Sequence, residues 1–416
     1  ALEQYIFGEE EFEDRSILEV KFENAENVLY GKRFYLDHGV DLVRSKYGEI
    51  GIDHKLDFSD KKYIYRQTNP FSGFGESLKN TNLNDEVKLR NIENVVSLNL
   101  QNNSLGELGV KGGHTYYNYG YNSVIFISDQ VVSNRLRGQN FSAGASYLNN
   151  LGPFSLYGDA MVNLAGDFSG HYLTAGAEFR LNAENIVNVE LNSNERAPNF
   201  NFLLYQSDYF DYNWQNSFGN QSIRSLTVGL NSEKLLNIEG SFNQIENYTF
   251  FAENEEGAVK PFQFNGGVSY LKIKANREFT YGKFSLDNTL MFQQVSSGSE
   301  VFKVPAFVTR NTFYYGDHWF KKALFVQTGF SFKYFTPYEM DGYDPVLAEF
   351  YVQNEVELGG FPAVDFFFNG KIRQTRIFFS LDNVNFLLSG NNNFSAPEYP
   401  YGDYLLRFGL VWNFFM

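Results

Sequence analysis

The feature that most constrains this chain is an alternation of apolar and polar residues in runs of about ten, repeated along most of its length. Residues at every second position share one face of a β-strand. In 169–181 the apolar positions alternate with Thr174, Gly176 and Glu178, and they are Leu173, Ala175, Ala177, Phe179 and Leu181. Helical periodicity is nearly absent. The sequence therefore predicts an all-β protein whose strands have one apolar and one polar face.

Sixteen spans carry this pattern. They are 47–66, 86–101, 105–117, 138–149, 153–163, 169–181, 184–195, 222–232, 235–250, 262–278, 281–297, 304–316, 323–336, 361–372, 374–385 and 402–416. Two more candidates, at 33–43 and 16–24, raise the predicted number to 16–18. We expect one barrel domain over 31–416, preceded by an acidic N-terminal segment over 1–30 that would include the possible first strand at 16–24.

Two features favour a membrane barrel over a soluble β-sandwich or propeller. Charged residues interrupt the polar faces, and aromatic residues gather near strand ends, as at Tyr281 and Trp412. Short connections such as 101–104 also alternate with long ones such as 196–221 and 337–360. This asymmetry is typical of outer-membrane barrels, which have short periplasmic turns and long extracellular loops. The sequence thus predicts a transmembrane, antiparallel, up-and-down β-barrel.

The composition of the chain argues against several other classes of protein and of site. The formal charge is −15, and no basic patch is evident, which argues against binding to nucleic acid. The chain has no cysteine, so it forms neither disulfides nor cysteine-based zinc sites. No apolar run approaches the ~18 residues that a transmembrane helix needs.

The last strand reads YLLRFGLVWNFFM over 404–416, and its alternate residues are all apolar or aromatic. A barrel in lipid must pair its last strand with its first, because lipid offers no hydrogen bonds to an open edge. An aromatic C-terminal strand also resembles the signal read by the barrel-insertion machinery of Gram-negative bacteria. That signal usually ends in Phe, whereas Met416 is last here.

The C-terminal eighty or so residues carry a distinctive set of short pieces, which are Tyr343, Pro345, Phe350, Gln353, Phe361-Pro362, Asp365, Asn369, Lys371-Ile372, Tyr399-Pro400, Arg407-Phe408-Gly409, Trp412 and Phe414-Phe415. In these pieces the segment resembles the putative porin family of Bacteroidota outer membranes. The segment VKFENAENVLYGKRFYLDH, 20–38, is similar to the same family. The resemblance implies an outer-membrane barrel with passive diffusion, and it supplies no catalytic residues.

Possible chemical sites are few, and we expect no catalytic, cofactor or metal site. His38 and His54 occupy equivalent positions in a short internal repeat, Asp-His-x-x-Asp, at 37–41 and 53–57. Each histidine shares its face with apolar residues, while the neighbouring aspartates point the other way, which makes a shared metal site geometrically poor. The segment 341–344 lacks the spaced oxygen ligands of a calcium loop and is interpreted as a turn. Neither G-x-S-x-G nor H-E-x-x-H occurs.

Two groups of residues are candidates for a transport site. Charges on the polar strand faces are expected to face the lumen, and they are Lys272, Lys274, Lys283, Asp287, Lys333, Arg376, Asp382 and Arg407. The aromatic loop 197–218 carries Phe200, Tyr205, Tyr209, Tyr212 and Trp214. This loop could constrict the lumen, provide a docking surface, or pack against neighbouring loops.

The leading functional hypothesis is a porin of the outer membrane of a Gram-negative bacterium that lets small hydrophilic solutes diffuse passively. The alternative is a non-conducting barrel that serves as an accessory or structural subunit of a larger outer-membrane complex. A fragment of a TonB-dependent receptor is less favoured, because no globular plug of suitable length precedes the strands. Expected partners are the lipid bilayer and lipopolysaccharide, with other outer-membrane proteins as a further candidate.

Overall fold

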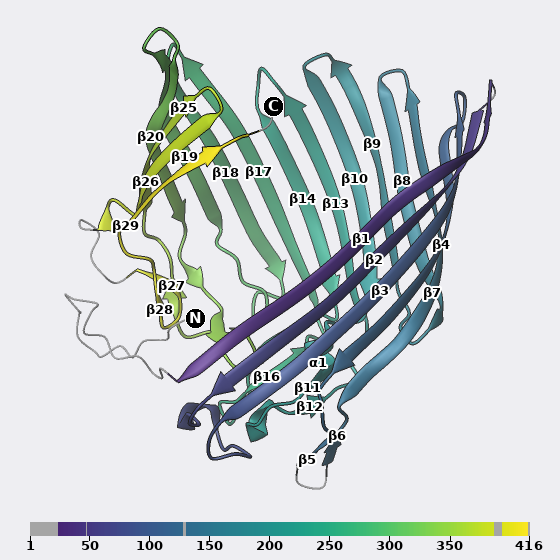
Figure 1. Cartoon of the computed structure of the whole chain (residues 1–416), viewed down its shortest axis with the longest axis vertical. Helices are drawn as coiled ribbons and strands as arrows, with labels where there is room; N and C mark the ends of the chain where they lie inside the picture. Colours follow the sequence, from purple (N-terminus) through teal and green to yellow (C-terminus); the bar gives the residue numbers. More distant parts are fainter. Residues whose placement is uncertain (1–23, 47, 128–129, 387–392, 415–416) are drawn as a thin grey trace.

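The computed structural model describes residues 24–46, 48–127, 130–386 and 393–414. Within these ranges the chain forms one seventeen-stranded antiparallel sheet in which each strand pairs with the next wall strand along the chain. The sheet curves around an interior that holds several loops (Figure 1). Among the described helices, none is long and apolar enough to cross a membrane.

The wall strands are β1 (Ala25–Ser45), β2 (Gly48–Gln67), β3 (Leu83–Asn102), β4 (Gly106–Gly120), β7 (Arg135–Leu151), β8 (Phe154–Gly166), β9 (His171–Asn182), β10 (Asn185–Arg196), β13 (Gln221–Ser232), β14 (Asn237–Glu246), β17 (Gly267–Tyr281), β18 (Phe284–Ser297), β19 (Phe307–Trp319), β20 (Leu324–Phe335), β25 (Ala363–Ile372), β26 (Thr375–Asp382) and β29 (Leu405–Trp412).

The connecting loops contain short elements of their own. They are β5 (Ile125–Ile127), β6 (Gln130–Val132), β11 (Leu204–Tyr205), β12 (Trp214–Gln215), β15 (Thr249–Glu253), β16 (Val259–Gln263), β21 (Tyr338–Glu339), β22 (Gly342–Asp344), β23 (Glu349–Val352), β24 (Glu357–Leu358), β27 (Phe394–Ala396), β28 (Tyr399–Pro400), the helix α1 (Phe200–Leu203) and the 3₁₀ turns η2 (Ser72–Phe74) and η3 (Phe210–Tyr212).

The predicted all-β antiparallel meander is confirmed. Each of the sixteen predicted spans overlaps one wall strand, and the candidate at 33–43 lies within β1. The candidate at 16–24 lies almost entirely outside the described residues, since only Asn24 of it is described. β1 begins at Ala25, ahead of the expected domain boundary at residue 31. In the described ranges the register gives no pairing between β29 and β1.

The long connections fall at one end of the sheet, as predicted, and the opposite end carries short turns; the connection 167–170 between β8 and β9 is a short one at the long-loop end. The short turns, such as the one between β17 and β18, lie at the top of Figure 1, and the loops that hold β5, β6, β11 and β12 lie at the bottom. We call these the turn end and the loop end. The segment 337–360 is one long loop whose β22 and β23 join β15 and β16 in a small four-stranded sheet.

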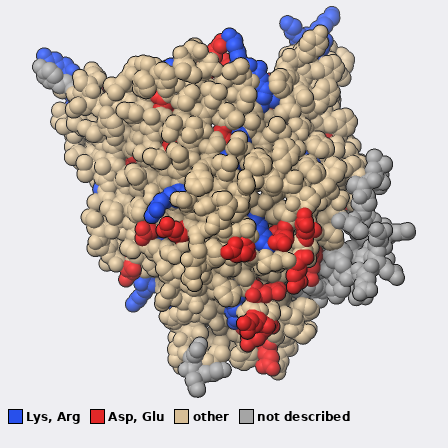
Figure 2. All heavy atoms as spheres, turned by 180° about the vertical axis from the view of Figure 1, so that it is seen from behind, with Lys and Arg blue, Asp and Glu red and all other residues tan. Residues whose placement is uncertain are grey.

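The outer face of the wall is apolar. Phe408 is 79% exposed, Leu164 69% and Val110 66%, and each lies on the apolar side of its strand. A soluble protein buries such a continuous stripe, whereas a membrane barrel turns it toward lipid. Viewed from behind, Lys and Arg lie along the turn-end edge of this surface, the area below that edge carries few charges, and Asp and Glu gather toward the loop end (Figure 2).

Candidate functional site

The inner face of the wall is the face opposite the apolar stripe, and it is lined by polar side chains. Partners across antiparallel strands share one face, so the register identifies the face of each residue. On β17, Ile273 is paired with Phe292 on the outer side, whereas Lys272 is paired with Gln293 and Lys274 with Met291 on the inner side. The register of the following strand pairs carries this inner face through to β29.

Seven of the eight charges expected to face the lumen share this inner face. They are Lys272, Lys274, Asp287, Lys333, Arg376, Asp382 and Arg407. Lys333 forms an ion pair with Asp365, and Arg407 forms one with Asp382.

Lys283 is placed differently. It lies in the turn between β17 and β18, and its ammonium group pairs with Asp317. The register of β19 places Asp317 on the same side as Phe313 and Tyr315, which is the outer side. The alternation rule applies only within a strand, and Lys283 stands just outside one.

Hydrogen bonds link polar residues across several strands of the inner face. Lys111 pairs with Asp159, whose other carboxylate oxygen accepts a hydrogen bond from Tyr172 at 2.8 Å. Tyr157, on the same strand β8 as Asp159, donates to Glu190 on β10 at 2.7 Å. These contacts fix charged and hydroxyl groups on the inner surface, where they are suited to contact water or polar solutes rather than lipid.

The loop end of the interior is occupied by a packed cluster that we call the loop cap. It consists of the 197–218 loop together with residues 67–83, 120–127, 130–135, 249–263 and 340–352 of neighbouring loops, which share one buried hydrophobic core. Phe202 stacks on Phe251 with ring centroids 4.5 Å apart, and Tyr205 stacks on Trp214 at 5.0 Å. Wall residues of β2, β3 and β4 pack against this core from the inner face.

Three polar anchors hold the 197–218 loop in the loop cap. The Asp85 carboxylate accepts hydrogen bonds from the Ser207 hydroxyl at 2.5 Å and the Asp208 amide at 2.7 Å. The Gln67 side-chain oxygen accepts a hydrogen bond from the Tyr209 hydroxyl at 2.5 Å. The third anchor, around Asp344, fastens this loop to the 340–352 loop.

Asp344 is buried, and its carboxylate accepts three hydrogen bonds. The Tyr212 hydroxyl donates to one oxygen at 2.6 Å, and the amides of Val346 and Leu347 donate to the other at 2.8 and 3.0 Å. Burial raises the pKa of Asp344 to about 6, although these hydrogen bonds oppose the shift. Asp344 ends β22 and binds amides of the turn that follows at 345–348. The prediction of a turn at 341–344 is therefore wrong, because Gly342–Asp344 pair with β23 as a short strand.

Most aromatic residues of the 197–218 loop lie inside the loop cap, whereas Phe210 is exposed. Tyr205, Tyr209, Tyr212 and Trp214 are all buried, with Tyr209 fully inaccessible. These four side chains are not an exposed docking surface, and their packing matches the alternative in which neighbouring loops pack together. Phe200 is half-buried and stacks on Tyr119 at 5.3 Å.

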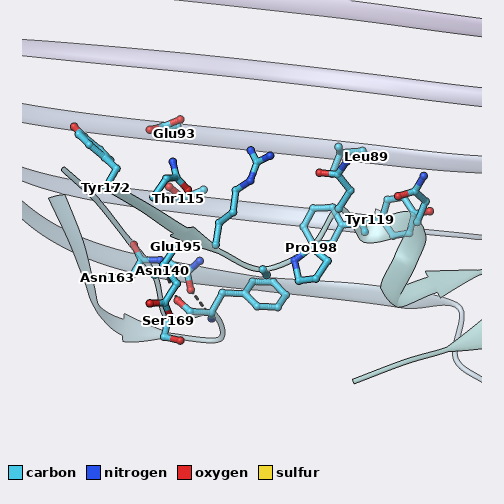
Figure 3. Close-up of a pocket in the computed structure, with 18 of the residues that line it drawn as sticks. Leu89, Glu93, Thr115, Tyr119, Asn140, Asn163, Ser169, Tyr172, Glu195 and Pro198 are labelled. Atoms are coloured by element: carbon cyan, nitrogen blue, oxygen red, sulfur yellow. Dashed lines mark hydrogen bonds between the residues drawn. The ribbon is translucent and has the colours of Figure 1, made fainter. Parts of the chain in front are cut away.

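A pocket of about 780 Å³ lies between the loop cap and the inner face of the wall. Its polar end includes Glu93, Thr115 and Tyr172, and its less polar end includes Leu89, Tyr119 and Pro198 (Figure 3). Asn140, Asn163, Arg196 and Phe200 also contribute to the lining. Sequence reasoning missed this pocket, because its residues come from eight wall strands and from connections that are far apart in the sequence.

The two histidines of the short internal repeat face each other. His38 is paired with His54 across β1 and β2, with ring centroids 5.1 Å apart, on the outer face. The neighbouring aspartates point inward, where Asp57 binds Arg33. In the described part of the chain no group of three or more His, Asp or Glu side chains is arranged to hold a metal ion.

Comparison with solved structures shows the same architecture. The copper transporter OprC aligns with a TM-score of 0.62 and 12% identity over 88% of this chain and 62% of its own. The siderophore receptor PirA from Acinetobacter baumannii gives 0.62 and 12% over 92% of this chain and 62% of its own. The ferric enterobactin receptor PfeA of Pseudomonas aeruginosa gives 0.60 and 9% over 91% and 70%.

These identities establish only the fold, a large antiparallel sheet like the barrels of TonB-dependent receptors. The chain spans less than two thirds of the length of OprC and PirA. Among curated proteins, none matches the sequence.

The family comparison is more specific. The sequence profile described as "Putative porin" matches residues 1–416, the whole chain. This profile describes a porin family rather than an enzyme family, which agrees with the expectation from the sequence that the chain has no catalytic site. On this match, the chain belongs to the putative porin family.

Proposed function

We propose that the protein is a porin of the outer membrane of a Gram-negative bacterium, through which small hydrophilic solutes diffuse down their gradients. The observation that carries this proposal is the opposition of the two faces: exposed apolar side chains outside and hydrogen-bonded charges inside. Such a wall suits lipid and lipopolysaccharide on one side and an aqueous lumen on the other. The sequence resemblance supports an origin in Bacteroidota.

The loop cap would narrow the outer mouth of this lumen. Its core packs on the inner face of β2, β3 and β4 and is held by the polar anchors at Asp85, Gln67 and Asp344. A solute would then pass beside the loop cap rather than through its buried core. Both signs of charge line the inner face, so we expect weak selectivity between cations and anions.

Single-channel recording in planar bilayers tests this function. The purified full-length protein should give stepwise, ohmic openings, and deletion of 197–218 should increase the conductance. Folding should be verified by heat-modifiable gel mobility. A folded wild-type protein that stays silent would refute passive diffusion.

The loop cap also supports a second candidate, a non-conducting barrel that acts as an accessory subunit of an outer-membrane complex. A well-packed core at the loop end is what a closed lumen would require. In that case both the wild type and the 197–218 deletion would be silent, and another outer-membrane protein would co-purify with the chain.

A further inference from the structure

We propose that the pocket between the loop cap and the wall is a binding site for a neutral saccharide. This inference rests on the proposed function, because it names the class of solute that the lumen would hold. The pocket volume of about 780 Å³ is in the range of small-molecule sites. Its lining and its unused hydrogen-bonding groups carry the assignment.

One wall of the pocket is aromatic. Phe200 stacks on Tyr117 at 5.2 Å and on Tyr119 at 5.3 Å, and Phe168 lies 5.2 Å from Tyr117. These contacts hold the ring of Phe200 rigidly, while the ring stays partly exposed within the lining. A rigid ring face offers apolar contact area at low entropic cost, which suits the C–H face of a sugar ring.

Planar amides line the opposite, polar end. The Asn140 side-chain oxygen accepts a hydrogen bond from the Phe168 amide at 3.0 Å, and the Asn163 side-chain nitrogen donates to the Phe168 carbonyl at 3.0 Å. Each side chain is thereby fixed by one end only. In the described structure the Asn140 nitrogen and the Asn163 oxygen make no hydrogen bond, so a donor and an acceptor are held in place for a ligand.

The charges of the pocket favour a ligand without net negative charge. Glu93 and Arg196 both line it, and neither forms an ion pair with another described residue. A further carboxylate is already engaged, since Glu349 accepts a hydrogen bond from Asn201 at 2.6 Å. The register places the side chain of Glu195 on the outer face, beside His171, so its carboxylate does not add to the charge of the pocket. Two carboxylates, Glu93 and Glu349, against the one guanidinium of Arg196 disfavour phosphates and other anions.

The aromatic face and the polar groups of the pocket together select one class of ligand. An apolar ligand would leave Glu93, Arg196 and the amides without partners, which is costly in a confined site. Charged planar groups and amides can instead pair with adjacent hydroxyl groups, while Phe200 covers the less polar face of the ring. A polyhydroxylated neutral ring satisfies both ends of the pocket at once.

Isothermal titration calorimetry on the full chain, folded in detergent micelles, tests the proposal with maltose and maltotriose as probes. Wild type should show saturable binding. Thr115→Val keeps the side-chain shape and removes one hydroxyl at the polar end, so it should weaken binding about fivefold, as the loss of one hydrogen bond implies. Phe200→Leu should also weaken it by removing the ring face.

Thr227→Val is the matched control, because Thr227 lies on the same inner face but outside the pocket lining. It should leave sugar binding unchanged. Glucose 6-phosphate and arginine test the charge argument, and neither should bind as tightly as the neutral sugars. Tighter binding of either charged probe, or equal weakening by Thr227→Val and Thr115→Val, would overturn the assignment.

Conductance measured on the same preparation separates the two proposals. A conducting protein that binds no neutral sugar overturns the saccharide site and leaves the porin function standing. A silent protein that binds maltotriose with the expected variant pattern supports the site and overturns the diffusion function.

Discussion

The hydrogen bond between Tyr212 and Asp344 should control how firmly the loop cap is closed. Both side chains are buried, and the hydroxyl-to-carboxylate distance is 2.6 Å. Tyr212→Phe keeps the ring in the core and removes only the donor. One oxygen of a buried carboxylate then loses its side-chain partner, while the other still accepts the two amides.

The expected size of the effect follows from the charge on Asp344. A hydrogen bond to a charged group contributes about 1.5–3 kcal/mol, and about 1.4 kcal/mol corresponds to a tenfold change in an equilibrium. The local opening of the loop cap should therefore become ten- to a hundredfold more frequent, by the same estimate. The wall strands should stay intact, because the deleted group touches only the loop cap.

Hydrogen exchange read by mass spectrometry measures this opening. Peptides covering 203–216 should exchange at least about tenfold faster in Tyr212→Phe than in wild type at pH 7.5. Tyr281→Phe serves as the control, since Tyr281 is 90% exposed at the turn end and should leave the loop cap unchanged. The difference should shrink at pH 5, where Asp344, with its pKa near 6, is mostly protonated.

Two results would refute this reasoning. Equal exchange of the loop-cap peptides in wild type and Tyr212→Phe would show that the hydrogen bond does not latch the loop. A uniform loss of protection, including the wall strands, would show that the substitution unfolds the sheet rather than opening the loop cap.

Three further predictions concern pH, selectivity and turn geometry. Burial raises the pKa of Asp344 from 3.8 to about 6, so the closed loop cap binds this proton more tightly than the open one. The stability that Asp344 contributes should therefore be full below pH 3.8 and be lost as the pH rises through 6. Burial also raises the pKa of the anchor Asp85 to about 7, so melting of the loop cap, followed by tryptophan fluorescence, should show stability falling until about pH 7 before it levels off. Lys274→Glu should shift the reversal potential in a salt gradient toward cations, whereas Lys283→Glu, the same charge change at the outer side of a turn, should shift it less. Gly106 has φ +78°, and an added Cβ would collide with the backbone of β7, so Gly106→Ala should lower the free energy of unfolding by more than about 1 kcal/mol. It should also lower the temperature at which the folded band is lost in the heat-modifiable gel assay. Gly282→Ala, with φ +61° and open space around it, should lower that temperature less.

The sequence alone determined the wall of this protein. Period-two alternation is a local property, because successive side chains of any strand point to opposite faces. It was therefore possible to predict sixteen strands, the side of the long loops, and the inner face of Lys272, Arg376 and Arg407 before the register was known. Lys283 escaped the rule because it lies in a turn, where side chains no longer alternate.

Only the tertiary structure decided what fills the interior. The loop 197–218 was visibly aromatic, but its sequence allowed a constriction, a docking surface or a packed loop. Tyr212 meets Asp344 across 132 residues, and the pocket brings Glu93 of β3 near Phe200 and Glu349 of two separate loops. Such contacts depend on how loops fold back into the barrel, and no local periodicity encodes the distance between them.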